Sequence, residues 1–474
     1  MKKFREPQSR HQVMLLPPSV EELVGANDLT RYVDMLVDEF DLRGMESKYS
    51  TRGRPGYHPR IIVKLLVYGK LRGISSSREL AQSAAENVRF MFLAQNERPD
   101  FRTISDFRKR HRDELAELLT QTIAIGVREN LIDLKCVSID GTKIQGSAGT
   151  KSFKSPEFLK EEIDRLEKEI QESLEKDIQS DDDEDDKHGD GDGEIRLTAA
   201  GEDKMVLREK LKKALNHYLS IEGEKPKGVS ITDPECRYMQ GKGINPSYNA
   251  QLAVDVKSLM AVGGYITTAC CDSSQLVTVV EDIQKRTGMT PESILADRGY
   301  SNLEGIAEIE NQKITAYVSI IDYNKHRPHT GFAYNPENNS YTCPEGRSLQ
   351  KFQEYPVGRA IRYRALDCKG CSQVSSCMPG RSDDSRRTIT VSTFHESAER
   401  VRRRLETPIG VTMRRLRSAT VEPVFGVIKH ALRFRRVSVR GSPMVDSVWK
   451  FQLAVYNILK LARYERGDFQ MAAA

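Results

Sequence analysis

Long hydrophobic runs are absent from this sequence of 474 residues, and aromatic residues make up only 7% of it. No apolar stretch approaches the roughly 20 residues that a helix needs to span a bilayer, so we expect no membrane partner. The basic start of the chain is followed only by Val13–Leu16 before two prolines, which is too short for a signal peptide. The sequence therefore predicts a cytoplasmic protein of two to four domains, at about 100–200 residues each.

Cysteine is also scarce, because eight residues in a chain of this length exclude the dense disulfide framework of small secreted proteins. Four of them occur in the motifs YTCPEG and LDCKGCSQVSSC, as Cys343, Cys368, Cys371 and Cys377. Four thiolates suit tetrahedral zinc and a C-x₂-C pair is typical of a zinc knuckle, so we weigh a structural Zn²⁺ against unmetallated buried cysteines. The others lie in or next to predicted strands, where we expect core positions: Cys136, Cys236, Cys270 and Cys271.

Charge is concentrated in two segments, although the net charge is only +5. Residues 401–440 hold ten Arg and one Lys against two Glu, whereas Asp181–Glu194 holds nine acidic residues and one Lys. A basic segment inside a globular chain predicts phosphate contacts, and a solvated helical face is the alternative.

Residues 1–130 have a helical pattern and no metal-ligand or nucleophile motif. Apolar residues recur at three- and four-residue spacing in Val20–Leu42 and Pro59–Leu71. Ser77 is a predicted N-cap, and residues 103–123 form a further basic helix. We expect a helical N-terminal DNA-binding domain, with a merely solvated basic surface as the alternative.

From residue 131 the pattern changes to that of an α/β domain, which we expect to extend to residue 465. The predicted order is three strands, a helix, a strand, a helix, a strand and two late helices, which favours a mixed five-stranded sheet flanked by helices. The strands fall at residues 135–143, 248–256, 261–269, 293–300 and 314–320, and the late helices at 421–432 and 445–464.

Two insertions interrupt this domain. Residues 151–227 predict a helical hairpin with a disordered acidic tip. Residues 322–400 are expected to be rich in loops and contain the four clustered cysteines, which suggests a zinc-ribbon-like insertion.

Three acidic residues have the placement of a metal-dependent site. Asp140 and Asp297 each end a predicted strand, and Glu422 is expected to open a helix, where the helix dipole stabilises a carboxylate. Carboxylates are the ligands that Mg²⁺ and Mn²⁺ prefer, and two such ions stabilise the attacking and leaving oxygens of a phosphoryl displacement. Taken singly, the two aspartates are better explained as turn residues before Gly141 and Gly299 than as metal ligands.

A lysine follows the glutamate at helical spacing. Lys429 lies seven positions after Glu422, so on a regular helix the two share a face. There Lys429 has three possible roles: a contact to a DNA phosphate, a partner for Glu422, or a solvated cation.

Blocks along nearly the whole chain resemble the DDE transposases of bacterial insertion sequences, in the branch with a helical N-terminal domain and an RNase H-like catalytic domain. The resemblance implies that Asp140, Asp297 and Glu422 are the acidic metal ligands and that Lys429 is the lysine after the glutamate. The matching blocks, in order, are HPRIIVKLLVYGKLRGISSSRELA (58–81), RPDFRTISDFRKRH (98–111), SIDGTKI (138–144), TDPECRYM (232–239), YNAQLAVD (248–255), ADRGYSN (296–302), YTCPEG (341–346) and VEPVFGVIKHALRFRRVSVRG (421–441).

The chain departs from the family's pattern ahead of the glutamate. Where relatives have an arginine it has Ser418, with Arg417 beside it, and Arg415 stands where they have a tyrosine. Nearby arginines, including Arg414, are expected to take over the phosphate contacts. The predicted DNA contacts are Arg415, Arg417, Lys429, Arg433, Arg435 and Arg436.

The resemblance implies a transposase that uses Mg²⁺ or Mn²⁺, with two ions expected, to cut and join double-stranded DNA. Its partners would be the element's terminal inverted repeats and target DNA, bound by a homo-oligomer in the cytoplasm, in association with the nucleoid. The alternatives are an RNase H-like nuclease without strand transfer and a transposase-derived DNA-binding regulator. No Ser or Tyr nucleophile stands out in the sequence.

Overall fold

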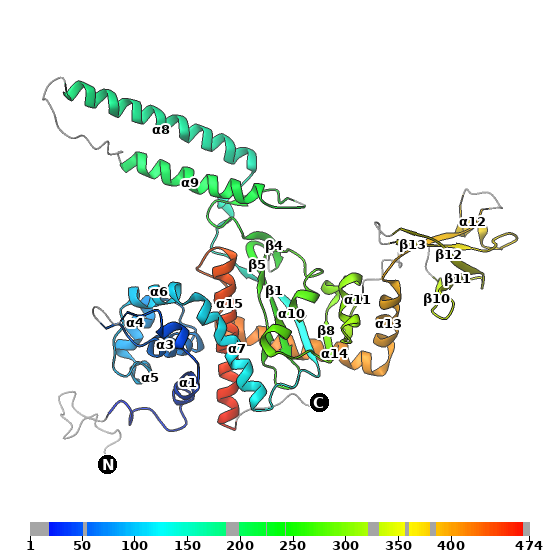
Figure 1. Ribbon diagram of the computed structural model, residues 1–474, viewed down its shortest axis with the longest axis horizontal. Coiled ribbons are helices and arrows are strands. Elements are labelled where there is room, and N and C mark those ends of the chain that lie inside the picture. Colours follow the sequence, from blue (N-terminus) through cyan, green and yellow to red (C-terminus); the bar gives the residue numbers. More distant parts are fainter. Residues whose placement is uncertain are drawn as a thin grey trace, which may run out of the picture. The chain divides into compact units, whose positions relative to one another are not determined.

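The computed structural model divides into two compact units (Figure 1). The first comprises residues 1–125, 428–434 and 450–470, and the second comprises residues 126–427, 435–449 and 471–474. The structure describes residues 19–50, 55–185, 199–223, 225–241, 243–320, 331–355, 360–379 and 385–467. None of the helices in those ranges is long and apolar enough to cross a membrane.

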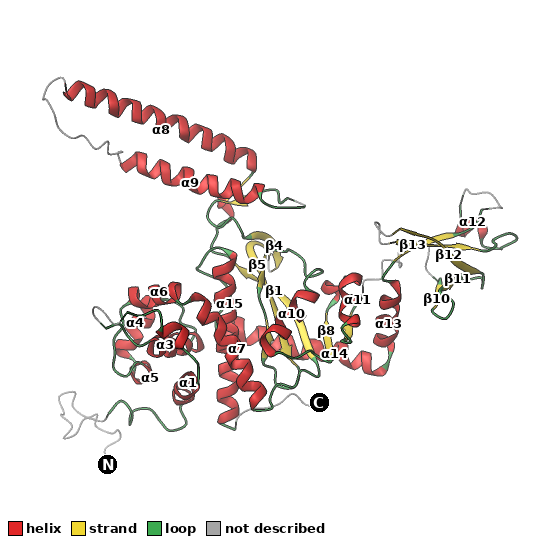
Figure 2. Cartoon of the chain, viewed as in Figure 1, coloured by secondary structure: helices red, strands yellow, loops and turns green. Residues whose placement is uncertain are grey.

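The N-terminal part of the first unit is helical (Figure 2). The predicted helix Pro59–Leu71 is confirmed as α3. It is buried along its length, and its buried Lys64 pairs with Asp34 and Asp38 of α1 at 2.6 and 2.8 Å. The helices are α1 (Leu29–Asp38), α2 (Arg43–Glu46), α3 (Pro59–Leu71), α4 (Ser77–Glu86), α5 (Val88–Leu93), α6 (Phe101–Arg110) and α7 (Arg112–Arg128).

Three helix boundaries differ from the prediction. Helix α1 begins only at Leu29, because the Asp28 side chain accepts from the backbone N–H of Thr30 and caps the helix there. The cap of α4 is Ser76, one residue before the predicted Ser77. The predicted helix 103–123 is divided between α6 and α7 at His111, which is fully buried.

A mixed sheet with flanking helices forms the centre of the second unit. Strands β4 (Arg237–Gly241), β5 (Gly243–Asp255), β1 (Val137–Gln145), β8 (Ser293–Ala296) and β9 (Thr315–Val318) lie side by side in that order. Strand β1 is antiparallel to β5 and parallel to β8, and β8 is parallel to β9. Two short strands, β6 (Ala261–Gly263) and β7 (Ile266–Thr267), also pair with β5.

This sheet has seven strands in the described residues, so the predicted number of five is wrong. The predicted strand 261–269 is divided into β6 and β7, because Gly264 donates its N–H to the Asp282 side chain at 2.8 Å. The long strand β5 extends beyond the predicted one at its N-terminal end, and that extension forms a hairpin with β4.

Helices cover the sheet. Helix α14 (Pro408–Gly426) packs against β1, β5 and β8, and α13 (His395–Glu406) packs against α14 and α11 (Leu303–Asn311). Helix α10 (Leu276–Thr287) packs against β5 and β6. In α15 (Ser442–Glu465), the fully buried Trp449 donates its indole N–H to the carbonyl oxygen of Gln251 at 2.9 Å, which ties the start of this helix to the sheet.

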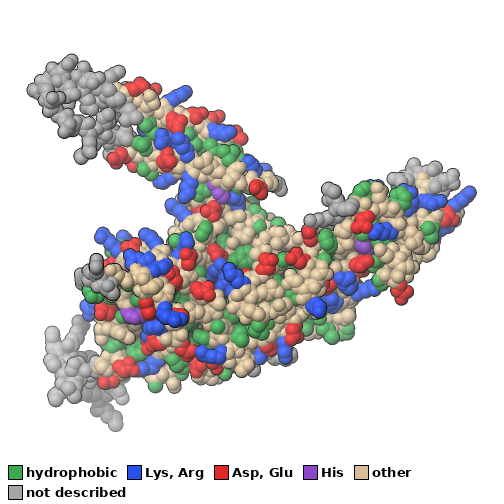
Figure 3. Space-filling view, viewed as in Figure 1, with side chains coloured by type: hydrophobic (Ala, Val, Ile, Leu, Met, Phe, Trp, Pro, Cys, Tyr) green, Lys and Arg blue, Asp and Glu red, His purple; other side chains and the backbone are tan. Residues whose placement is uncertain are grey.

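The segment 151–227 forms a helical hairpin, as its sequence pattern suggests. Helices α8 (Pro156–Asp185) and α9 (Ala199–Leu219) pack through a small core, beside the 3₁₀ turn η1 (Thr150–Ser152) and the strand pair β2 (Phe153–Lys154) and β3 (Val229–Ser230). Acidic and basic side chains are mixed over the hairpin (Figure 3). Residues 186–198, which include most of the predicted acidic tip, lie outside the described residues.

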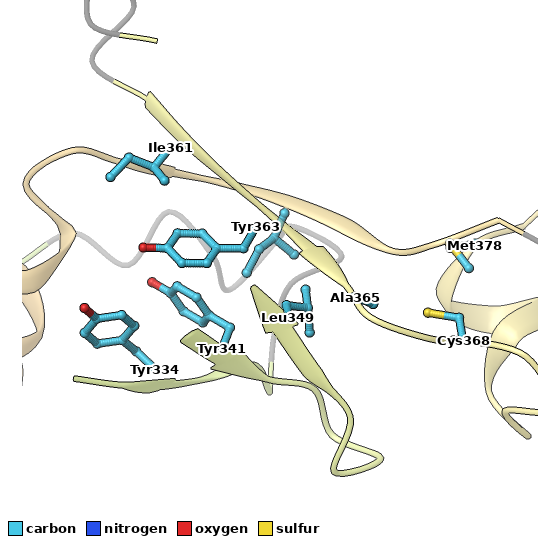
Figure 4. Packing of buried hydrophobic residues seen from close by; sticks show 9 residues of the cluster. Tyr334, Tyr341, Leu349, Ile361, Tyr363, Ala365, Cys368 and Met378 are labelled. Atoms are coloured by element: carbon cyan, nitrogen blue, oxygen red, sulfur yellow. The ribbon is translucent and has the colours of Figure 1, made fainter. Parts of the chain in front are cut away.

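The segment 322–400 contains, besides the expected loops, an antiparallel sheet that the sequence did not predict. Strands β10 (Ala333–Asn335), β11 (Ser340–Thr342), β12 (Ser348–Tyr355), β13 (Ala360–Ala365) and β14 (Thr388–Ser392) follow one another in spatial order. Tyrosines and aliphatic residues cover one face, and Cys368 and Met378 extend this core beside α12 (Val374–Cys377) (Figure 4). Short polar strands with one buried residue in two give a weak apolar pattern, which hid the sheet in the sequence.

Candidate active site

The parallel pairing of β1 and β8 brings two of the predicted acidic residues together. Ile139 pairs with Ala296, so Asp140 and Asp297 follow at the same level of two adjacent strands. Asp140 Oδ1 accepts from the N–H of Gly141 at 2.8 Å, and Asp297 Oδ1 accepts from the N–H of Gly299 at 2.7 Å. Asp297 thus follows the end of β8 and has the turn contact that sequence alone suggested. Asp140 instead lies inside β1, where it pairs with Leu252, so its predicted place at the end of a strand is wrong.

The electrostatic environment of Asp140 includes both Arg417 and Asp297. Burial raises the pKa of Asp140 from 3.8 to about 6, the Arg417 guanidinium lowers it, and the negative charge of Asp297 raises it. Two carboxylates that repel one another in a partly buried site favour a cation or a proton between them.

Glu422 lies near the C-terminal end of α14, so the expectation that it opens a helix is wrong. The helix begins at Pro408, where the Thr407 side chain caps the N–H of Gly410 at 3.1 Å. Pro423 lies inside the helix. The N-terminal helix dipole therefore does not stabilise this carboxylate, whose side chain is 60% exposed.

Arg417 connects the glutamate to the sheet. Its guanidinium donates to Asp140 Oδ2 at 3.1 Å and to Glu422 Oε1 at 3.5 Å. The Ser138 hydroxyl donates to the carbonyl oxygen of Arg417 at 3.3 Å, which anchors this turn of α14 to β1. The positively charged guanidinium of Arg417 thus lies between the carboxylates of Asp140 and Glu422.

The donor types fit a hard divalent ion, but their present spacing does not. Among the described residues, no group of three or more His, Cys, Asp and Glu side chains is arranged to hold a metal ion. Asp140 and Asp297 are adjacent, whereas the Arg417 guanidinium intervenes between Asp140 and Glu422. A metal held by all three carboxylates would require Arg417 to move.

The predicted DNA-contact residues fall in both units. Arg415, Arg435 and Arg436 belong to the second unit and are exposed. Lys429, in the π-helical turn Val427–Ala431, and the exposed Arg433 belong to the first. The π turn changes the rotation per residue, so the predicted shared face of Lys429 and Glu422 no longer follows from their spacing.

The backbone of the basic segment joins the end of β1. Gln145 donates its N–H to the carbonyl oxygen of Arg435 at 3.2 Å and accepts from the N–H of Val437 at 2.9 Å. Arg435 and Arg436 are therefore attached to the strand that carries Asp140.

Sequence reasoning missed four polar residues beside the aspartates: Asp272, Asn249, Gln251 and Tyr300. Asn249 and Gln251 donate to Asp272 Oδ1 at 2.6 and 2.8 Å, and Tyr300 donates to Gln251 Oε1 at 2.5 Å. One signal was available, since Asn249 and Gln251 alternate within the otherwise apolar strand YNAQLAVD. Nothing in the sequence distinguished Asp272 from an ordinary loop aspartate.

The four clustered cysteines line one cavity of the cysteine-rich sheet, together with Arg347 and Arg387. The backbone N–H groups of these arginines donate to Cys343 Sγ at 3.3 Å and Cys368 Sγ at 3.4 Å. Burial raises the pKa of the Cys377 thiol, Arg387 lowers it, and the other three cysteines raise it. The thiols are thus neighbours, although no group of them in the described part of the chain has metal-ligand spacing.

The other cysteines follow the core prediction only in part. Cys236 is buried and Cys136 is half-buried, but Cys270 and Cys271 are exposed. The prediction is wrong for the last two because β7 ends at Thr267, so they lie in the loop before α10.

Two family models match the chain. Residues 18–110 match the model described as "Transposase domain (DUF772)", and residues 342–462 match the model described as "Transposase DDE domain". The second match includes Glu422, whereas Asp140 and Asp297 lie outside both matched segments. No curated protein and no solved structure matches.

The matches support a transposase with a DDE domain, and such a domain implies a nucleotidyl-transferase type of enzyme with a DNA substrate. Together they support a DDE transposase of an insertion sequence. Such enzymes typically use a divalent metal ion.

Proposed function

We propose that this chain cuts DNA at the ends of an insertion sequence and joins the freed ends to target DNA, using Asp140, Asp297 and Glu422 as its acidic catalytic residues. The observation that carries the proposal is the pairing of Ile139 with Ala296, which gives two aspartates adjacent strand positions. The contacts of Arg417 with both Asp140 and Glu422 support the inclusion of the glutamate of α14. The mixed sheet is consistent with an RNase H-like fold.

Arg417 has two states in this proposal. In the DNA-free chain its guanidinium neutralises Asp140 and Glu422. When DNA binds, a phosphate offers it a stronger bidentate partner, and its departure leaves the carboxylates free for Mg²⁺ or Mn²⁺. A pair of such ions would stabilise the attacking and leaving oxygens of the phosphoryl displacement.

The chemistry needs no covalent protein–DNA bond. Water attacks the phosphodiester and releases a 3′-hydroxyl, which then attacks a phosphodiester of the target and displaces one of its oxygens. Exposed arginines next to β1, including Arg435 and Arg436, would hold the flanking phosphates. Terminal repeats at both ends of an element favour a homo-oligomer, acting on the nucleoid in the cytoplasm.

We also propose the domain boundaries given by the sequence: a DNA-binding domain at residues 1–130 and a catalytic domain at 131–465, interrupted at 151–227 and 322–400. In the latter insertion, Cys343, Cys368, Cys371 and Cys377 would bind a structural Zn²⁺. The N–H···S contacts at two of the cysteines support this, because such contacts stabilise thiolates over thiols. Elemental analysis for zinc tests this proposal, and metal-free protein would contradict it.

The test of function uses the purified full chain, Mg²⁺, a supercoiled target plasmid and duplex DNA that ends in the repeats flanking the gene. We expect nicking at the repeat ends and a joined product. Asp140→Asn, Asp297→Asn and Glu422→Gln should each abolish both products but retain DNA binding. Glu406→Gln, an exposed carboxylate at the end of α13, is the matched control and should leave both products unchanged.

Two outcomes would contradict the proposal. Nicking without joining would identify a nuclease. Binding without nicking would identify a regulator.

A further inference from the structure

A carboxylate outside the three predicted ones faces the same site. Asp272 lies in the loop between β7 and α10, and its side chain is 20% exposed. Its Oδ1 accepts from Asn249 Nδ2 at 2.6 Å and from Gln251 Nε2 at 2.8 Å. Both amides come from the central strand β5 and are fully buried.

The network behind Asp272 fixes its orientation. The Tyr300 hydroxyl donates to Gln251 Oε1 at 2.5 Å, which directs the amide nitrogen of Gln251 to Asp272. Two buried donors on one oxygen hold the carboxylate in one orientation. A buried amide destabilises a fold unless it is hydrogen-bonded. Asp272 accepts from the amide nitrogen of each of these two residues and so offsets part of that cost.

Two glycines show how closely Asp272 approaches the catalytic aspartates. A Cβ on Gly141, the residue after Asp140, would stand 2.6 Å from Asp272 Oδ1. A Cβ on Gly299 would stand 2.9 Å from Asp297 Oδ1 and 3.7 Å from Asp272 Oδ2. The oxygen of Asp272 that the amides leave unused therefore faces the same space as the Asp297 carboxylate.

Tyr300 belongs to the same cluster, because its hydroxyl donates to Gln251, which in turn donates to Asp272. Burial raises the pKa of its hydroxyl well above the ordinary value, and the negative charges of Asp272, Asp140 and Asp297 each raise it further. One buried hydroxyl group is thus within electrostatic range of all three aspartates.

We infer that Asp272 is a fourth carboxylate of the active site, and that its Oδ2 binds the divalent ion held by Asp297. This inference rests on the proposed function. Two divalent ions carry four positive charges against three from Asp140, Asp297 and Glu422, and Asp272 supplies the fourth negative charge. In the metal-free chain, Lys143 Nζ lies 3.8 Å from Asp272 Oδ1 and offsets part of that charge.

The experiment is Mn²⁺ binding to the full chain bound to duplex DNA, with the DNA alone as the blank, measured by calorimetry and by the decrease of the free-Mn²⁺ spin-resonance signal. Asp272→Asn keeps the shape of the side chain and its contacts to the two amides, but removes the ligand charge. We expect its Mn²⁺ affinity to fall by at least about tenfold. Glu281→Gln removes the same charge from an exposed position of α10, and its affinity should equal that of the parent.

Equal Mn²⁺ affinity in Asp272→Asn and the parent, with a clear loss in Asp297→Asn, would overturn the inference but leave the proposed function standing. Absence of Mn²⁺ binding by the DNA-bound parent would instead contradict the proposed function itself.

Hydroxyl-radical cleavage of the unaltered chain by bound Fe²⁺ gives a second measurement that requires no variant to fold. We expect backbone cuts beside Asp272 as well as beside Asp140 and Asp297. Cuts at the latter two alone would also overturn the inference.

Discussion

Replacing Asp140 by Asn should stabilise the metal-free protein above pH 6, although it should abolish cleavage. The reason is the position of the carboxylate, which is largely buried and faces Asp297. Asn has the shape of protonated Asp and carries no charge. In the metal-free protein, the buried negative charge of Asp140 destabilises the folded state. The substitution removes that charge.

The magnitude follows from linkage. The pKa of Asp140 is raised from 3.8 to about 6, so between these values the folded chain binds more protons than the unfolded chain. Stability then falls as pH rises through this window, at about 1.36 kcal/mol per unit, and the loss is complete above pH 6. Asp140→Asn should therefore match the parent below about pH 4 and exceed it by up to about 3 kcal/mol at pH 8.

Urea unfolding with a chelator present, at pH values from 4 to 8, measures this difference. Adding Mg²⁺ at pH 8 should then stabilise the parent and leave the variant unchanged. A variant that is less stable than the parent at pH 8, or a difference that stays constant across the pH range, would refute the reasoning.

Four further outcomes are expected. Arg417→Ala should raise Mn²⁺ affinity in the absence of DNA, because the carboxylates lose a competing cation, and an unchanged calorimetric affinity would contradict this. Replacing Arg435 and Arg436 by Ala should flatten the salt dependence of DNA binding by up to about two units, and an unchanged slope would exclude them from the DNA path. Gly141→Ala should destabilise the chain by about 1–3 kcal/mol, because its Cβ would stand 2.6 Å from Asp272 Oδ1. An unchanged free energy of unfolding in urea would show instead that the loop carrying Asp272 moves to make room. Cys371→Ser should lower the zinc content, and full retention of zinc would remove this residue from the proposed ligands.

Sequence patterning predicted most helices, and it predicted β1, β5, β8 and β9 in their order along the chain. Amphipathic spacing identified α3 to the residue, and alternating residues identified β1 and β5. It missed β4 and treated β6 and β7 as one strand. Patterning also failed to predict the start of α14. The cap at Thr407 and Pro408 lies in a basic stretch where apolar residues do not recur at helical spacing.

For the candidate site, the sequence predicted the helix or strand on which each acidic residue lies. It did not predict which residues contact one another. Asp140 lies within an alternating strand and Asp297 follows an apolar one, and both patterns are local signals. The ion pair of Arg417 with Asp140 and the network of Asp272 with Asn249 and Gln251 join residues far apart in the sequence. A single sequence contains no information on such pairings, so these contacts required the structure.

The central claim is that Asp140, Asp297 and Glu422 hold divalent metal once Arg417 has moved to DNA. Anomalous diffraction from crystals of the chain with duplex DNA and Mn²⁺ tests it most directly. We predict a manganese peak within about 2.2 Å of carboxylate oxygens of Asp140 and Asp297, Glu422 within reach of the same ions, and the Arg417 guanidinium on a phosphate. A DNA-bound structure without a manganese peak, and with Arg417 still between Asp140 and Glu422, would contradict the account.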